Sequence, residues 1–288
     1  MELKTMQCKN CGANISFDPK LQVMKCEFCG STYLVETQVK PTGADEKVII
    51  FKVDEREGNT CFDTWVKKGL FKPGDLPRLL TKSPLQGMYI PSWHFLISTN
   101  TNWSGEKRTT RTVTERDFQG RAVNRTVEEW QYRNGNRNES YSLFIASSGG
   151  LANEEMDALA PFPVEEAVAF TQEYITGKQA EVPVKTVEQA LAEAKQMVET
   201  KEKKAVESEV DRITSFNLYY NSETHNLVYV PIWITGYKYK DKYYRVLING
   251  STKEVVGKKP ISAGRVLIAI GIVAVVIAVV GWAIYYFG

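Results

Sequence analysis

This chain of 288 residues contains few cysteines and histidines, and its net charge is low. Each of these features reduces the number of functional classes to which the protein can belong. The chain holds five cysteines and two histidines. Four of the cysteines fall within the first 29 residues, which is not the spread of a secreted disulfide framework. The net charge of +2 provides no overall field that would steer the protein toward nucleic acid or an acidic surface.

The sequence leads us to expect neither a leader nor one of the common catalytic motifs. Residues 1–25 contain no apolar core segment, so no signal peptide is expected. We find no phosphate-binding glycine loop, nucleophile elbow or paired-carboxylate motif. His94 and His225 are far apart and adjoin predicted strands, and Cys61 has no histidine near it in the sequence. We therefore expect these three to be structural residues, and the protein not to be an enzyme.

Two Cys-x-x-Cys pairs, separated by 14 residues, stand near the start of the chain. Each pair bends a tight turn that points both sulfurs to one side, and the glycine after it permits the positive φ that such a turn needs. Two facing pairs form a tetrahedral shell with sulfur about 2.3 Å from zinc, which leaves no position for an activated water. The sequence therefore predicts one structural zinc ion in a zinc ribbon, with the ligands Cys8, Cys11, Cys26 and Cys29.

The charge of the predicted ribbon bears on what it contacts. Residues 1–40 hold five lysines, four acidic residues and no arginine. Four thiolates on one zinc ion add negative charge. Ribbons in general bind DNA, RNA or protein, but nucleic-acid binding needs a basic face with stacking aromatics. A protein contact or a purely structural role is favoured here over nucleic acid.

The segment 266–287 is apolar throughout, with 22 residues and no charge. A helix of that length reaches about 33 Å, enough to cross a hydrocarbon core of about 30 Å. Trp282, Tyr285 and Tyr286 gather at its far end, where an aromatic belt would lie. The sequence therefore predicts a single-pass helix in the lipid bilayer through 266–287.

The orientation of this helix follows from its flanks. Lys258, Lys259 and Arg265 precede the span, so the positive-inside rule places the N-terminal part in the cytoplasm, on the inner face of the cell membrane. Only Gly288 follows Phe287. We therefore expect insertion after synthesis, as in a tail-anchored protein.

Small residues recur within the span at intervals of three and four. On a helix, the positions Gly271, Ala274, Ala278 and Gly281 form one stripe. Such a stripe lets two helices approach closely in lipid, which predicts a homo-oligomer through these four residues. The spacing also arises by chance, because glycine and alanine are common in membrane helices.

A soluble region of the α+β class is expected between the two ends. Pro41, Thr42 and Gly43 indicate a linker before it. The expected division is a zinc ribbon over 1–35, a linker over 36–47, an α+β soluble domain over 48–257, and a juxtamembrane segment with the transmembrane helix over 258–288.

The soluble region shows both helical and strand patterns. Helices are expected over 54–69, 153–161 and 163–177, and over 186–210 after a capping box formed by Thr186 and Gln189. Strands are expected over 48–53, 229–239 and 243–248, and over 88–145 with turns near Gly105, Gly120 and Asn134-Gly135. Tyr89-Ile90-Pro91-Ser92-Trp93 is echoed by Tyr229-Val230-Pro231-Ile232-Trp233, which suggests two equivalent strands of one sheet.

The stretch 106–137 allows two interpretations. It holds eight basic residues, interleaved with acidic ones and with Trp130 and Tyr132. If its arginines converge on one exposed stripe, it can follow a phosphate backbone. The solvated face of a β-sheet explains the same pattern equally well.

Several segments together resemble a prokaryotic group of TFIIB-type zinc-ribbon-containing membrane proteins. They are the two cysteine knuckles Cys8-Lys9-Asn10-Cys11-Gly12 and Cys26-Glu27-Phe28-Cys29-Gly30, then Phe51-Lys52-Val53-Asp54, Tyr89-Ile90-Pro91-Ser92-Trp93, Val230-Pro231-Ile232-Trp233 and Asn249-Gly250. Some proteins of this kind resemble membrane partners of phage-shock-type envelope-stress modules, where they help to recruit soluble proteins to the membrane. The resemblance covers nearly the full chain and implies the architecture more than a biochemical activity.

The expected function is that of a membrane-anchored zinc-ribbon scaffold or adaptor. It would present a cytoplasmic domain for protein–protein interaction, with an unidentified cytoplasmic or membrane protein as partner, and the resemblance implies an envelope-stress response. The alternative is a membrane-tethered nucleic-acid-binding or transcription-related zinc-ribbon protein.

Overall fold

The computed structural model describes most of the chain beyond its N-terminal region. It covers residues 4–8, 12, 14–17, 23–26, 32–34 and 46–287, except 149, 172, 175–177 and 182. Helices and a large sheet both occur, so the predicted mixed α+β class is confirmed. Contacts divide the chain into a first unit, Met1–Ser92, Ala146–Val184 and Val228–Gly288, and a second unit, Trp93–Ile145 and Lys185–Leu227.

Two short antiparallel hairpins occur in the N-terminal region of the first unit. The first pairs β1 (Lys4–Gln7) with β2 (Asn14–Phe17), and the second pairs β3 (Val23–Lys25) with β4 (Thr32–Leu34). Gln7 is paired with Asn14, and Lys25 with Thr32. Cys8 comes directly after β1, and Cys26 comes directly after β3.

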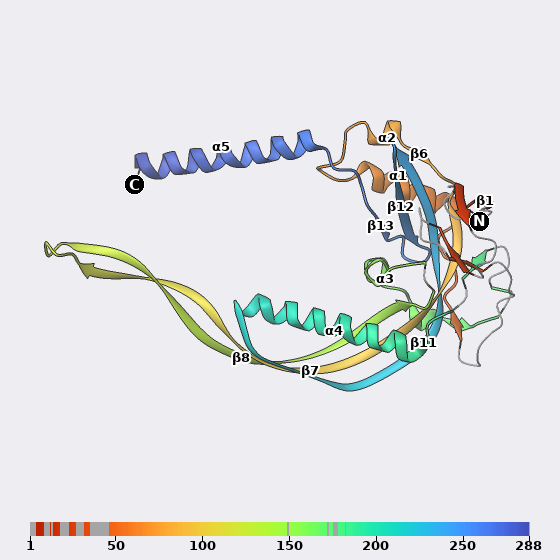
Figure 1. Ribbon diagram of the computed structural model, residues 1–288, viewed down its shortest axis with the longest axis horizontal. Coiled ribbons are helices and arrows are strands. Elements are labelled where there is room, and N and C mark those ends of the chain that lie inside the picture. The colour runs from red at the N-terminus through yellow and green to blue at the C-terminus, as the bar shows by residue number, and fades with distance from the viewer. Residues whose placement is uncertain are drawn as a thin grey trace. The chain divides into compact units, whose positions relative to one another are not determined.

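A mixed sheet forms the body of the first unit (Figure 1). Its strands follow the order β10, β7, β11, β12, β13, while β5 and β6 also pair with β11, and β9 pairs with β5. The bounds are β5 Lys47–Val48, β6 Thr81–Lys82, β7 Gln86–Arg116, β9 Val168–Ala169, β10 Gln179–Ala180, β11 Arg212–Tyr239, β12 Lys242–Asn249 and β13 Val255–Gly257. The strands expected over 229–239 and 243–248 fall in β11 and β12, which form a hairpin in which Tyr239 is paired with Lys242.

Helix α1 (Glu55–Lys67) packs its apolar side onto this sheet. It begins at a capping box in which the Asp54 carboxylate accepts from the Glu57 amide at 2.7 Å and the Glu57 carboxylate accepts from the Asp54 amide at 3.2 Å. Phe62 and Val66 are buried in a core cluster with Trp233, Tyr237 and Val246. The remaining helices of this unit are α2 (Leu76–Leu79), α3 (Asn153–Leu159), the 3₁₀ helix η1 (Val164–Glu166) and α5 (Ala263–Phe287).

The second unit contains a long hairpin made by β7 and β8 (Ala122–Ala146). Side chains bridge the two strands at Ser98–Ser140 (3.2 Å), Asn102–Asn136 (2.7 Å) and Thr114–Asn124 (2.8 Å), and the numbering shows that the strands are antiparallel. The hairpin turns at Asp117, whose carboxylate accepts from the amides of Gln119 and Arg121 at 2.8 and 2.9 Å. β11 is the other neighbour of β7.

Helix α4 (Val187–Glu209) buries one side against the strands of the second unit. The predicted capping box is present, with 3.4 Å from the Gln189 amide to the Thr186 hydroxyl and 3.0 Å for the reciprocal bond. The buried cluster joins three residues of the helix to four of the strands: Ala190, Ala194 and Val198 with Phe95, Ile97, Leu143 and Ile145. This burial supplies the apolar contact that a long, charged helix needs to be stable.

A carboxylate lies in the interface between α4 and the strands. Glu202 is 0% exposed, its Oε1 accepts from the Tyr141 hydroxyl at 2.6 Å, and its Oε2 accepts from Arg137 Nε at 3.2 Å. Burial and then the bond to Glu202 raise the pKa of Tyr141, so the phenol remains a donor at neutral pH. The charge is thus compensated inside the second unit.

We expect Glu202→Ala to destabilise the protein by about 3 kcal/mol in urea denaturation, because it leaves the Arg137 guanidinium and the Tyr141 hydroxyl without their buried acceptor. The matched control is Glu199→Ala, which removes an exposed ion pair with Lys203 and should cost less than about 1 kcal/mol. Equal effects of the two substitutions would show that the buried pair adds nothing.

Two expectations for the secondary structure are wrong because the pairing of β5 with β9 determines the conformation of both segments. The helix expected over 163–177 is replaced by η1 and β9, because Val168 and Ala169 pair with Val48 and Lys47 of β5. The strand expected over 48–53 is correspondingly short and ends at Val48. Sheet pairing thus prevails over the local helical pattern.

The turns expected near Gly105 and Asn134-Gly135 are also wrong, since both glycines lie inside strands. A Cβ added to Gly135 would lie 2.6 Å from the indole of Trp103. The glycine therefore makes room for an aromatic ring on the neighbouring strand and marks no reversal. The turn near Gly120 is confirmed, with φ +77° at that residue.

Candidate metal centre and membrane anchor

Each N-terminal hairpin places a cysteine directly after its first strand. Cys8 follows β1 and Cys26 follows β3, and both residues are buried. The Gly12 amide donates to the Cys8 carbonyl at 2.9 Å, and Gly12 has φ +73°. A buried thiol followed by a tight turn with a left-handed glycine is the local geometry of a metal-binding knuckle, so the described atoms fit a thiolate ligand at this position.

Two of the four predicted ligands, Cys11 and Cys29, lie outside the described residues. Within the described part of the chain, no group of three His, Cys, Asp or Glu residues is close enough to hold a metal ion. A four-cysteine site needs all of its thiolates. The described residues therefore contain half of the predicted ligand set, Cys8 and Cys26.

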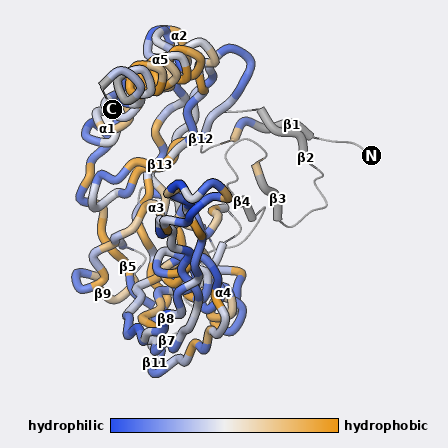
Figure 2. Tube along the Cα trace, turned by 90° about the vertical axis from the view of Figure 1, so that its left-hand side faces the viewer, coloured by the Kyte–Doolittle hydropathy of each residue, from blue (hydrophilic) through white to orange (hydrophobic). Residues whose placement is uncertain are grey.

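Helix α5 contains a stretch that is long and apolar enough to cross a membrane. The stretch Ala263–Trp282 has 20 residues, a mean hydropathy of 2.7 and none of its membrane-length window buried in the protein. Figure 2 shows apolar residues along this helix. Its length and composition agree with the predicted anchor, and its lack of burial distinguishes it from a core helix.

The first turn of α5 and the residues before it are hydrogen-bonded to the end of α1 and to the segment after it. Lys259 Nζ donates to the carbonyls of Trp65 and Lys68 at 2.6 and 2.8 Å, where a cation also complements the C-terminal end of a helix. The Ser262 amide donates to the Phe71 carbonyl at 2.8 Å. Arg265 Nη1 donates to the carbonyl of Leu70 at 3.1 Å. These hydrogen bonds therefore hold the start of α5 against the end of α1 and the residues that follow it.

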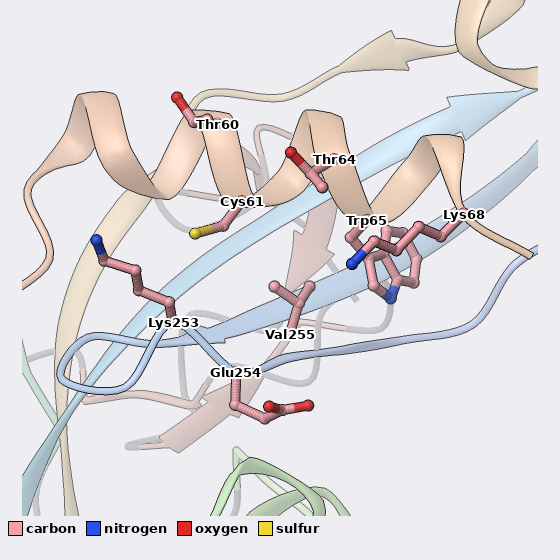
Figure 3. A pocket seen from close by; sticks show the side chains of 8 residues that line it. All are labelled: Thr60, Cys61, Thr64, Trp65, Lys68, Lys253, Glu254 and Val255. Atoms are coloured by element: carbon pink, nitrogen blue, oxygen red, sulfur yellow. The ribbon is translucent and has the colours of Figure 1, made fainter.

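The fifth cysteine lines a groove on the first unit. Cys61 is partly buried on α1, beside a groove of about 400 Å³ whose walls include Trp65, Lys253 and Val255 (Figure 3). Burial raises the pKa of the Cys61 thiol, so it is protonated at neutral pH and a weak nucleophile. This agrees with the structural role expected from the sequence.

Both histidines lie in strands, as expected. His94 is buried, with its Nε2 2.9 Å from the Ser142 hydroxyl and its ring 4.7 Å from that of Phe144. The ring of His225 lies 6.0 Å from that of Trp93. These contacts are those of packed sheet residues.

Sequence reasoning missed the bonds made by the juxtamembrane cations. It used Lys259 and Arg265 only as an indication of topology, whereas Lys259 donates to a carbonyl within α1 and Arg265 donates to one in the segment after it. Their targets lie some 190 residues earlier in the chain, at Trp65 and Leu70, and no local pattern links the two. Only the tertiary structure shows that the start of α5 is hydrogen-bonded to this part of the first unit.

The chain was compared with protein-family models, with known proteins and with solved structures. No protein-family model matches it, and no solved structure matches it. The chain is similar to "Uncharacterized protein YdjG" of Bacillus subtilis (strain 168), with 28% identity over 314 aligned residues. The alignment covers 90% of this chain and 91% of that protein.

Proposed function

We propose that the protein is a membrane-anchored zinc-ribbon scaffold or adaptor that presents a cytoplasmic domain for protein–protein interaction in an envelope-stress response. α5 enters the bilayer of the cell membrane, with the rest of the chain in the cytoplasm because Lys258, Lys259 and Arg265 precede the span. Cys8, Cys11, Cys26 and Cys29 hold one structural zinc ion. The zinc stabilises the two small hairpins, which are too short to fold on their own apolar burial.

The observation that carries the adaptor role is the β7–β8 hairpin. Its turn exposes 95% of Phe118, and Tyr132 on β8 is 66% exposed. Aromatic residues anchor protein interfaces because they bury a large area with little loss of side-chain entropy. A long hairpin with such residues offers a surface that a partner can cover.

The charges of the hairpin support a protein partner over nucleic acid. Five of the eight basic residues of 106–137 pair with carboxylates: Arg108 with Glu128, Arg111 with Glu129, Arg121 with Asp117, Arg125 with Glu115, and Arg137 with Glu139 and Glu202. Paired guanidinium groups do not form the continuous positive stripe that a phosphate backbone requires. The alternative, a membrane-tethered nucleic-acid or transcription-related binder, becomes one outcome of the test below.

The test is quantitative affinity purification of the tagged full-length protein from detergent-solubilised membranes. We expect a defined set of proteins to be retained by the wild type and lost with Phe118→Ser/Tyr132→Ser. The matched control is Tyr219→Ser, at an exposed tyrosine of β11 outside the hairpin. Retention of the same set by the hairpin variant, or a set that nuclease treatment releases, would contradict the adaptor proposal.

A second element of the proposal is self-association of α5. No atom lies within 4 Å of a Cβ added to Gly271 or Gly281, so these positions are open to a second helix. We expect Ala274→Leu/Ala278→Leu to weaken dimerisation about fivefold in a membrane two-hybrid assay, because the added bulk separates the backbones. Val276→Leu/Val280→Leu, on the opposite side of the helix, is the control. An unchanged signal from the alanine variant would mean that the stripe is only composition.

A further inference from the structure

An exposed apolar loop lies beside the start of α5. Leu70 is 76% exposed, Phe71 is 42% exposed, and Ile261, just before the helix, is 73% exposed. The carbonyls of Leu70 and Phe71 accept hydrogen bonds from Arg265 and from the Ser262 amide. The loop is therefore within one side-chain length of the residue at which the apolar span begins. Figure 1 shows this connection between α1 and α2 next to the start of α5.

Positive charge concentrates in the same part of the first unit. The segments 67–78, 238–242 and 258–265 carry ten lysines and arginines but only two carboxylates, Asp75 and Asp241, a net charge of +8. The whole chain carries only +2, so the remainder is net negative. Burial and then the positive charges of Lys72 and Lys68 lower the pKa of Lys259.

The three segments meet around one polar groove. It has a volume of about 630 Å³, within the size range of small-ligand sites. Its walls come from the start of α2, the β11–β12 turn and the residues before α5: Pro73–Asp75, Tyr239–Lys242, Tyr244 and Pro260–Ala263. Asp75 accepts from the Tyr239 hydroxyl at 2.9 Å, so its charge is partly satisfied within the protein. Lys240 and Lys242 line the same groove.

Some cations of this region donate to groups of the protein itself, and others have no carboxylate partner among the described residues. Lys259 and Arg265 are used internally, since their donors reach backbone carbonyls. Among the described residues, no carboxylate forms an ion pair with Lys68, Lys72 or Lys242. These three ammonium groups are available to an external anion near the residues that precede α5.

We propose that this membrane-proximal surface, defined by Lys68–Lys72, the β11–β12 turn and the groove between them, binds the phosphate headgroups of anionic phospholipids in the leaflet that α5 enters. Leu70 and Phe71 insert between the headgroups, and Lys68, Lys72 and Lys242 contact the lipid phosphates. A basic surface at the start of a span gains roughly 1 kcal/mol per cation from an anionic leaflet, a factor of about five. The inference rests on the proposed membrane insertion of α5. It adds a lipid class and a second point of contact, which would hold the first unit against the bilayer.

The experiment measures hydrogen exchange of the full-length protein in nanodiscs of two compositions, phosphatidylcholine alone and phosphatidylcholine with 30% phosphatidylglycerol. We expect peptides covering 68–74 and 238–244 to exchange roughly tenfold more slowly in the anionic discs. The variant Lys68→Glu/Lys72→Glu/Lys242→Glu should abolish that difference. Lys240 is left unchanged because its φ of 54° tolerates few side chains. Inorganic phosphate added to the neutral discs should not reproduce the protection.

The control variant is Arg116→Glu/Arg133→Glu/Lys204→Glu, which makes the same charge change at exposed positions of the second unit and should keep the protection. Leu70→Ser/Phe71→Ser should reduce protection in both kinds of disc. Exchange that does not depend on lipid charge, in protein that co-elutes with the discs, overturns this inference and leaves the anchor intact. Failure to co-elute with either kind of disc overturns the anchor and the lipid site together.

Discussion

Full-length protein purified with its thiols reduced is expected to carry one zinc ion per chain, and Cys8→Ser is expected to remove it. Structural zinc sites of this kind contribute on the order of 10 kcal/mol of apparent binding free energy, which is folding free energy for hairpins as short as β1–β2 and β3–β4. Loss of one thiolate leaves three ligands and an open position. Metal analysis by mass spectrometry reads the result directly.

The control for the zinc prediction is Cys61→Ser. Cys61 lies on α1, outside the N-terminal hairpins, and lines the groove beside Trp65. Its substitution should therefore leave the zinc content at one ion per chain. The hairpins should become sensitive to protease in Cys8→Ser, while the sheet of the first unit remains resistant, because its core cluster contains no residue of the N-terminal hairpins. Zinc-free wild-type protein, or zinc retained in Cys8→Ser, would contradict the four-cysteine site.

Val273→Arg/Ile277→Arg is expected to move the protein from the membrane fraction to the soluble fraction. Each arginine at the centre of a span costs about 2.5–3.5 kcal/mol on insertion scales, so two cost roughly 6 kcal/mol. Both positions lie in the middle of α5 and are exposed in the protein itself, so the domain should be unaffected. Carbonate extraction followed by immunoblotting measures the distribution.

A matched pair of arginines outside α5 separates insertion from general effects on folding. Val123 and Val184 are exposed to a similar degree, and Val123→Arg/Val184→Arg should leave the protein in the membrane fraction. If the α5 variant stays in carbonate-resistant membranes, the helix is not what holds the chain there.

The helices that pack onto a sheet could be predicted from the sequence because their ends carry local signals. Asp54 and Glu57 begin α1, and Thr186 and Gln189 begin α4, each through bonds within four residues. The echo around Tyr89 and Tyr229 also corresponds to a structural fact, since it falls on the neighbouring strands β7 and β11. Where the determinant is local, the amino-acid pattern suffices.

Long-range pairing explains what could not be predicted. Val168 and Ala169 form a strand because they pair with β5, more than a hundred residues earlier in the chain. The need for glycine at position 135 comes from the ring of Trp103, which leaves no room for a Cβ. Glu202 is an intermediate case. The charged run 199–212 is expected from its composition to be an exposed helix surface, yet Glu202 is buried and continues the four-residue spacing of Ala190, Ala194 and Val198. Its partners Arg137 and Tyr141 lie on β8, and no local pattern links them to it. The same limit applies to the candidate site, where the cysteine spacing is local and the contacts of Lys259 are not.

The proposed topology has α5 in the bilayer and both units in the cytoplasm. Protease treatment of intact spheroplasts and of inside-out vesicles, followed by peptide mapping, tests it most directly. We predict cleavage at exposed sites such as the Asp117–Arg121 turn in the vesicles and full protection in the spheroplasts. Protection of the same sites in inside-out vesicles, with cleavage in spheroplasts, would place the units on the other side of the membrane and contradict the proposed topology.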